Sequence, residues 1–305
     1  MTGNMNCDHQ CTSTKRVLVK RNGRLNRQFS SASKCAVVAL CGGMLVGFTW
    51  TTAQAHGPVF SPAPETIWKG GTEVTLGYHR DDAGPQTGQE AFLEIEHGLT
   101  AQWEIGVQVP FVSRAEGDLS SDGLGDIVLG TKYQFWKRDL PGAQYKAAGF
   151  LKVKVPTART ETVPQLGSGS TDVIGGLAAG YESRRWYWFA SGVYRLNSEG
   201  DDGLVKGDRQ SLNLVGGIRP FLSEYDEPDT VIMLELNWER DGRDAVNGQT
   251  LANTGGWQLF ASPVLWWTYR QVAVRAGVQI PVAWKLNGNQ PRAEYRAKME
   301  FVYHF

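Results

Sequence analysis

The chain has few cysteines, and all of them lie near one end. Four occur among its 305 residues, at Cys7, Cys11, Cys35 and Cys41. All four precede residue 55, where the pattern described below predicts that an export leader is removed. The mature chain is therefore expected to hold no thiol and no disulfide. This excludes cysteine nucleophiles, cysteine-ligated zinc and iron–sulfur clusters from the mature protein.

Long uncharged apolar runs are missing from residue 56 onward. Hydrophobic residues make up 41% of the sequence, yet no stretch in that part approaches the roughly 18 uncharged residues of a membrane-spanning helix. We therefore expect no helical membrane span there. Outer-membrane β-barrels have such sequences, because half of every strand faces a polar lumen.

Histidine is scarce as well, with only His56, His79, His97 and His304 after the leader. None lies near a serine in a recognisable nucleophile setting, so we expect no catalytic residue, no cofactor and no enzyme activity. His56 would become the N-terminal residue after cleavage, and an α-amine with an imidazole can chelate copper. It is a weak metal-ligand candidate, and the alternative is that it is incidental to the processing site.

Residues 1–55 are predicted to be a signal peptide with a long basic region. Basic residues cluster from Lys15 to Lys34, the uncharged run Cys35–Trp50 follows, and Ala53–Ala55 forms a small-x-small site. The apolar run has about 16 residues, fewer than the roughly 20 of a spanning helix. The length of the basic region leaves translation from a later start codon as an alternative.

The neutral formal charge of the chain hides an acidic mature protein. Removing the leader takes seven basic residues and one acidic residue from 31 of each, leaving 24 and 30 and a net charge of −6. This balance argues against nucleic acid as a partner.

From residue 72 onward, apolar and polar residues alternate in twelve runs. In the last run, residues 293–305, the odd positions are apolar or aromatic and most even positions are charged. Successive side chains of a strand point to opposite faces, so each run predicts a strand with one apolar and one polar face. The predicted strands are Thr72–Arg80, Ala91–His97, Ala101–Phe111, Asp126–Trp136, Tyr145–Val155, Thr171–Glu182, Trp186–Leu196, Ser211–Phe221, Thr230–Glu239, Trp257–Thr268, Gln271–Trp284 and Ala293–Phe305.

The joins between these runs alternate between short and long. Short or modest joins follow every second strand, and longer polar joins such as Asp81–Glu90 and Val112–Gly125 fall between them. This alternation predicts an all-β fold, a transmembrane antiparallel β-barrel of twelve strands over residues 72–305 with both termini periplasmic. Ten or fourteen strands are alternative counts. The proline-rich residues 56–71 are expected to be irregular, either in the periplasm or tucked into the barrel mouth.

The last predicted strand has an aromatic face. On an exposed edge strand of a soluble protein, such a face would promote aggregation. Phe301, Tyr303 and Phe305 lie on this face. They resemble the C-terminal signal by which the outer-membrane assembly machinery recognises its substrates. We therefore expect the assembly machinery and the lipid bilayer to be partners of the chain.

The alternation also predicts which side chains line the lumen. In one interpretation, acidic and basic walls create a transverse field that orients passing solutes. In the other, the charges neutralise one another in a plugged interior. Phe150, Phe260 and Trp266 would line the route by which an apolar solute enters the lumen. The lumen-lining candidates are Glu73, Glu94, Glu96, Glu104, Asp126, Lys132, Phe150, Lys152, Lys154, Arg195, Arg219, Glu235, Phe260, Trp266, Arg275, Glu294, Arg296, Lys298 and Glu300.

The stretch Gly123–Tyr133 resembles a family of outer-membrane transporter-like proteins named for the meta-cleavage pathway of phenol degradation. The resemblance covers roughly residues 71–305 and implies an outer-membrane β-barrel that passes small organic compounds such as aromatics. It implies no catalytic residue. We therefore expect a channel for small organic molecules, with a closed structural or ligand-binding barrel as the alternative. Further similar stretches are His97–Thr100, Gly106–Pro110, Glu235–Asn237, Ser262–Pro263 and Ala276–Pro281.

Overall fold

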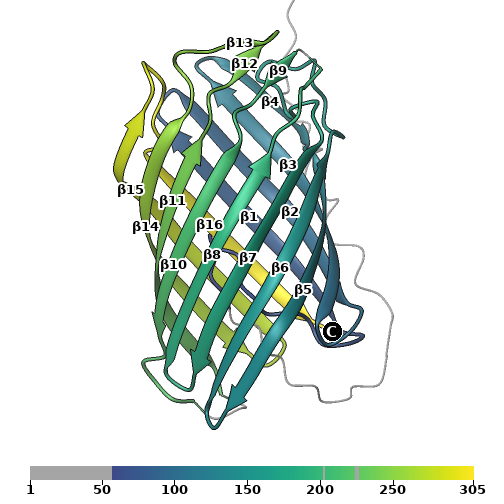
Figure 1. The fold of residues 1–305 in the computed structure, drawn as a ribbon, viewed down its shortest axis with the longest axis vertical. Helices are drawn as coiled ribbons and strands as arrows, with labels where there is room; N and C mark the ends of the chain where they lie inside the picture. The colour runs from purple at the N-terminus through teal and green to yellow at the C-terminus, as the bar shows by residue number, and fades with distance from the viewer. Residues whose placement is uncertain (1–56, 202, 224–226) are drawn as a thin grey trace, which may run out of the picture. The chain divides into compact units, whose positions relative to one another are not determined.

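The strands of the chain close into a single antiparallel barrel (Figure 1). The computed structural model describes residues 57–201, 203–223 and 227–305. Each barrel strand pairs with the next one along the chain, and the last pairs with the first. Twelve strand positions result, because β4 and β5 follow one another along the same neighbour, β3. The barrel strands are β1 (Thr72–Ala83), β2 (Gln86–Gly98), β3 (Trp103–Glu116), β4 (Leu119–Leu124), β5 (Ile127–Leu140), β6 (Ala143–Val155), β7 (Asp172–Ser183), β8 (Trp186–Leu196), β10 (Arg209–Ile218), β11 (Asp229–Asp241), β14 (Gly256–Tyr269), β15 (Val272–Leu286) and β16 (Tyr295–His304).

The twelve-strand antiparallel barrel confirms the predicted fold class and excludes the counts of ten and fourteen. β9 (Leu204–Val205), β12 (Ala245–Val246) and β13 (Gln249–Thr250) form a separate small sheet. It lies at the upper end in Figure 1, and β16 ends at the opposite end. Within the described ranges, no helix is long and apolar enough to cross a membrane.

Two of the expected long joins are tight turns instead. β1 continues to Ala83 and β2 begins at Gln86, with Gly84 in the left-handed region at a φ of 70°. β3 and β4 meet in the same way around Gly117, whose φ is 57°. The prediction of polar loops over Asp81–Glu90 and Val112–Gly125 is therefore wrong. These strand ends carry polar residues toward both faces, so the period-two signal disappears although the backbones still pair.

Burial follows the alternation along each strand, as β11 illustrates. Ile232 and Leu234 are 49% and 52% exposed, whereas Met233 between them is 2% exposed. The residues on the second face are buried because the lumen is largely filled. The exposed face is apolar around the barrel, and its main-chain groups are satisfied within the closed sheet. A lipid bilayer requires both properties of a surface that it covers.

Candidate functional site: the barrel lumen and the segment inside it

Residues 57–71, here the N-terminal segment, contain no strand and lie inside the barrel. Val59 and Ile67 are 4% and 8% exposed, and Pro64 is among the most buried side chains. Its three prolines lack amide hydrogens, so fewer main-chain donors need partners in the lumen. The inward-facing side chains of the barrel supply those partners.

Glu235 on β11 is the central anchor of the segment. Its carboxylate is 0% exposed and accepts hydrogen bonds from the amides of Val59 and Phe60, at 2.7 and 3.2 Å. The hydroxyl of Ser61 donates to its other oxygen at 2.6 Å. A buried carboxylate is stable only when it is well solvated by donors, and the turn of the segment provides them.

A second anchor lies on β3 and β5. Glu104 accepts a hydrogen bond from the amide of Ile67 at 2.7 Å, and its other oxygen lies 2.7 Å from Lys132 Nζ. Lys132 Nζ also donates to the carbonyl of Glu65 at 2.6 Å. Gln134 Nε2 donates to the carbonyl of Pro64 at 3.0 Å. At this anchor the barrel therefore makes its hydrogen bonds to the main chain of the segment.

The only acidic side chain of the N-terminal segment, Glu65, is buried against β6 and β7. Glu65 Oε1 lies 3.5 Å from Lys146 Nζ, which lies 2.8 Å from Glu182 Oε2. Two carboxylates thus share one ammonium group. Burial, and then the nearby charge of Glu182, raises the pKa of Glu65 to about 8.

Strands β8, β10, β11 and β14 form the packed wall, where apolar inward side chains meet the segment. Trp266 and Phe260, expected from their parity to face inward, are 1% and 0% exposed. Trp266 belongs to an apolar cluster with Val59 of the segment, and Phe60 packs against that cluster. The guanidinium of Arg296 lies 4.5 Å from the Phe260 ring centre. The other cluster members are Tyr187, Phe189, Val215, Val231, Met233, Val264, Ala273 and Val302.

A ladder of polar side chains crosses the same wall beside this cluster. Asn237 Nδ2 donates to Ser61 Oγ at 2.9 Å and to Asn213 Oδ1 at 3.1 Å. Asn237 Oδ1 accepts from Ser262 and Gln279, both at 2.9 Å. The residues of this ladder are buried, so the network fixes the height at which the segment turns. Sequence reasoning missed it, although asparagines at inward positions of two adjacent strands were a usable signal.

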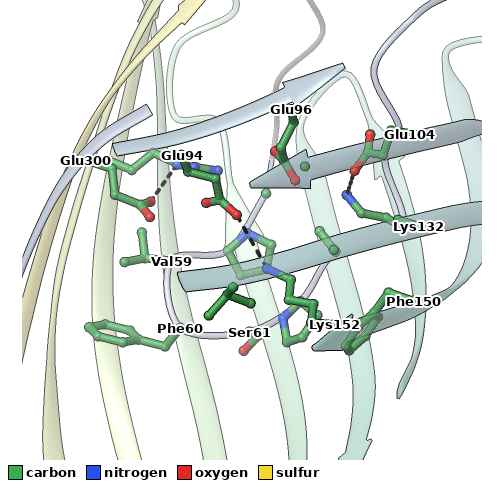
Figure 2. A pocket seen from close by; sticks show the side chains of 18 of the residues that line it. Val59, Phe60, Ser61, Glu94, Glu96, Glu104, Lys132, Phe150, Lys152 and Glu300 are labelled. Carbon is green, nitrogen blue, oxygen red and sulfur yellow. Dashed lines mark hydrogen bonds and ion pairs between the residues drawn. The ribbon is translucent and has the colours of Figure 1, made fainter. Parts of the chain in front are cut away.

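Strands β2, β3, β5 and β6 form the open wall, which leaves a cavity beside the segment (Figure 2). The cavity has a volume of about 280 Å³. Its lining joins charged groups from the barrel with Phe150 and with Val59 and Phe60 of the segment. Lys152 Nζ and Glu94 Oε1 lie 3.5 Å apart across it, and their side chains remain 38% and 20% exposed.

Two inward glycines make this geometry possible. Gly106 and Gly130 pair directly across β3 and β5. A Cβ at Gly130 would lie 3.3 Å from Lys152 Cγ, and one at Gly106 would lie 2.9 Å from Glu96 Cγ. The stems of Lys152 and Glu96 therefore lie flat against the wall in the space where side chains would otherwise stand.

The structure distributes the predicted lumen residues over several groups. The cavity brings together the largest number from distant parts of the sequence. Arg296 lies 2.9 Å from Glu239, near the end of the barrel that carries the longer joins, here the long-join end. Arg219 follows β10 and lies 2.7 Å from Asp229. Glu294 directly precedes β16, is exposed and does not line the cavity. His56 lies outside the described residues. The predicted residues that line the cavity are Glu94, Glu96, Glu104, Lys132, Phe150, Lys152, Arg275, Lys298 and Glu300.

Near β1, Glu73 and Arg275 pair at close range with other inward groups. Glu73 Oε2 lies 3.2 Å from His304 Nδ1, and Arg275 Nε lies 2.9 Å from Glu300 Oε2. Lys298 Nζ lies 2.8 Å from Glu300 and donates to the carbonyl of Val59 at 3.1 Å. Acidic and basic groups of β1, β15 and β16 thus pair at short range.

A further cluster at the long-join end holds residues 156–171. Lys154 Nζ lies 2.7 Å from Asp172 and 3.4 Å from Asp126. Arg195 approaches Asp172 to 2.6 Å. Asp126 accepts hydrogen bonds from main-chain amides of the join, including that of Ser168 at 3.2 Å. These predicted residues therefore fix an inward-folded loop. Asp172, 1% exposed, lies in the predicted strand Thr171–Glu182 but was not among the predicted lumen residues.

The C-terminal residues expected to signal assembly lie at the end of β16. Phe301 and Phe305 are 44% and 67% exposed on the outer face. Tyr303 and Phe305 contact edge to face with ring centres 4.7 Å apart. Across the described ranges, no group of three or more His, Cys, Asp or Glu side chains is arranged to hold a metal ion.

Comparison with known proteins identifies the family. A family whose description reads "Putative MetA-pathway of phenol degradation" matches residues 55–279. Since this match covers most of the sequence, the chain belongs to that family. A comparison with curated proteins gives no match.

One solved structure shows the same architecture. A crystal structure of an outer membrane channel from Pseudomonas putida F1 is similar with a TM-score of 0.66 and 16% identity, covering 81% of this chain and all (100%) of that one. The NanC porin (TM-score 0.46, 11% identity, 76% and 98% covered) and a Bordetella autotransporter β domain (0.47, 12%, 78% and 100%) are more distant. With its closed barrel and apolar outer face, the chain is a protein of the bacterial outer membrane.

Proposed function

We propose that this member of the family is a channel for small organic molecules, including aromatic ones. The observation that supports the proposal is the charged cavity of about 280 Å³ between the N-terminal segment and the open wall. In a barrel whose opposite wall is closed by packing, this space is where a solute can pass. The Pseudomonas putida relative is described as a channel, and we extend that description to this chain as part of the proposal.

The lining of the cavity suits amphipathic solutes. Lys152 and Glu94 face each other loosely, so they can exchange their mutual contact for contacts to a solute of either charge. Phe60 of the segment and Phe150 of β6 offer apolar surface to a solute. A single-ring compound with a charged or polar substituent matches this combination in size and chemistry.

A closed barrel with a structural or ligand-binding role is the second candidate. The hydrogen bonds that Glu235 and Glu104 accept from amides of the N-terminal segment favour it, because they hold the segment across the lumen. In this case the cavity is a binding site without an exit.

Solute flux separates the two candidates. The purified, folded protein should conduct ions in a planar bilayer and make liposomes swell in single-ring aromatic acids or amines. The variant Lys152→Met removes the charge beside the cavity and keeps the aliphatic part of the side chain. We expect it to change the ion selectivity of conductance. Folded protein without conductance and without swelling would contradict the channel and leave the closed barrel.

Three further features complete the proposal. Residues 1–55 act as an export leader, both termini face the periplasm, and the aromatic end is the signal for the assembly machinery. The basic and apolar composition of residues 1–55 supports the first, and the short turns at the end where β16 finishes support the second. N-terminal sequencing of protein purified from outer membranes should begin at His56, and a different first residue would contradict the leader boundary.

A further inference from the structure

The N-terminal segment is bound as a ligand is bound, through its main chain. Its amides at Val59, Phe60 and Ile67 donate to buried carboxylates of the barrel. Its carbonyls at Val59, Pro64 and Glu65 accept from Lys298, Gln134 and Lys132. Both the amide donors and the carbonyl acceptors of the segment therefore find side-chain partners on the barrel.

The segment is attached to the barrel ladder only at its end. The amide of Gly70 donates to the carbonyl of Gly98 at 2.7 Å, and that of Gly98 donates to Gly71 at 3.0 Å. Gly70 has a φ of 79°, in the left-handed region that glycine adopts readily. From Gly57 to Lys69, side chains of the wall replace strand pairing. The segment can therefore separate from the wall around Gly70 without breaking the barrel.

Two features make the wall selective for this kind of chain. The prolines at 58, 62 and 64 favour an extended conformation before binding, which lowers the entropy lost on ordering. Val59 enters the apolar cluster, and Ser61 meets both Glu235 and Asn237. Main-chain contacts thus supply binding, while two side-chain positions set the register.

We infer that the barrel lumen is a binding site for a proline-containing peptide, which the chain's own N-terminal segment occupies with a bend over residues 59–61. In a barrel without this segment, the same site takes the peptide from solution. The inference concerns peptide binding and stands apart from solute flux, so either can fail while the other holds.

The test uses a fluorescein-labelled peptide with the sequence of residues 57–69 and a barrel in which residues 57–67 are deleted. Fluorescence anisotropy in detergent should show binding to the deleted barrel, and at least tenfold weaker binding to the full chain. Glu235→Gln in the deleted barrel should weaken binding at least tenfold. Asp241→Asn, on the same strand but paired with Arg209 at the other end, should leave it unchanged. Equal binding of a scrambled peptide, or no binding by a folded deleted barrel, would overturn the inference.

A second measurement covers the case in which the deleted barrel does not fold. The full chain has no cysteine after position 41, so Ala63→Cys places one reporter in the segment. A water-soluble maleimide should label it slowly. Adding Glu235→Gln should speed labelling at least threefold, and adding Asp241→Asn should not. Equal rates in all three proteins would show that Glu235 does not hold the segment, and the inference would fall.

Discussion

The packed wall and the open wall of the barrel meet the same N-terminal segment in different ways. On the packed wall, Trp266 and its neighbours form one buried apolar cluster with Val59. On the open wall, Lys152 and Glu94 leave a cavity. Apolar contacts are favourable and non-directional, so apolar side chains pack closely against the segment. Charged side chains need water or a polar partner, so the wall that carries them leaves room for water.

The comparison predicts that the two walls differ in their tolerance of truncation. Trp266→Ala should lower the free energy of unfolding by about 3–5 kcal/mol, because a large buried side chain leaves a cavity that the barrel cannot close. Phe150→Ala should cost clearly less, because its side chain already borders the cavity. Heat-dependent gel mobility and urea unfolding in detergent measure both. Similar losses for the two variants would show that the walls are packed alike.

Lys154→Glu should give the next largest effect, although it lies next to Lys152 on the inward face. The variant would set a third carboxylate beside Asp126 and Asp172, at a site where the ammonium is 10% exposed. Breaking a buried ion pair in this way should cost about 3 kcal/mol and release residues 156–171 from the wall. Limited proteolysis should then cut this join. A variant as stable and as resistant as the parent would contradict the buried pairing.

Lys152→Glu should leave the fold intact and act on permeation alone. Its ammonium group borders the cavity and is partly exposed, so the charge can be reversed without a buried cost. Reversal next to Glu94 should shift the ion selectivity toward cations, by roughly twofold or more. Reversal potentials in planar bilayers under a salt gradient measure the shift. An unchanged potential in a conducting variant would place the ion path elsewhere.

The strands of both walls and their inward side chains were predictable from the sequence. Period-two alternation gives the strands and the inward parity of residues such as Trp266 and Glu235, because a barrel strand obeys the same rule along its whole length. The cavity was not readable. It depends on the path of the N-terminal segment, which has no periodicity, and on Gly106 and Gly130, which look like ordinary turn or strand glycines until Lys152 is seen lying across them.

The two long joins predicted over residues 81–90 and 112–125 failed for a related reason. Beyond the apolar band both faces of a strand meet water, so sequence patterns no longer separate an extended hairpin from a loop. Pairing partners along the chain determine the outcome there, and a single sequence does not contain them. The ion pair of Asp172 was hidden in the same way, because its partners Lys154 and Arg195 come from neighbouring strands.

The last expected effect concerns Glu65, which the segment places against the wall of β6 and β7. Its pKa is raised from 4.5 to about 8 by burial and then by Glu182, while Lys146 is the cation that faces it, with Lys132 further away. The buried state therefore binds a proton that the unfolded state has already lost between these two values. Stability should accordingly fall as pH rises from about 4.5 to about 8, and stay level above that range.

Glu65→Gln should remove this contribution, because an amide stays neutral at every pH of the range. The quantity to measure is the difference in melting temperature between the parent and the variant, so that other titrating groups cancel. The parent should lose stability relative to Glu65→Gln as pH rises to about 8, and the difference should then be constant. Glu294→Gln, at an exposed position before β16, controls for the loss of one carboxylate. A difference that stays flat from pH 4.5 to 8 would mean that Lys146 keeps Glu65 ionised, and that the segment is held by an ion pair there instead of by a neutral acid.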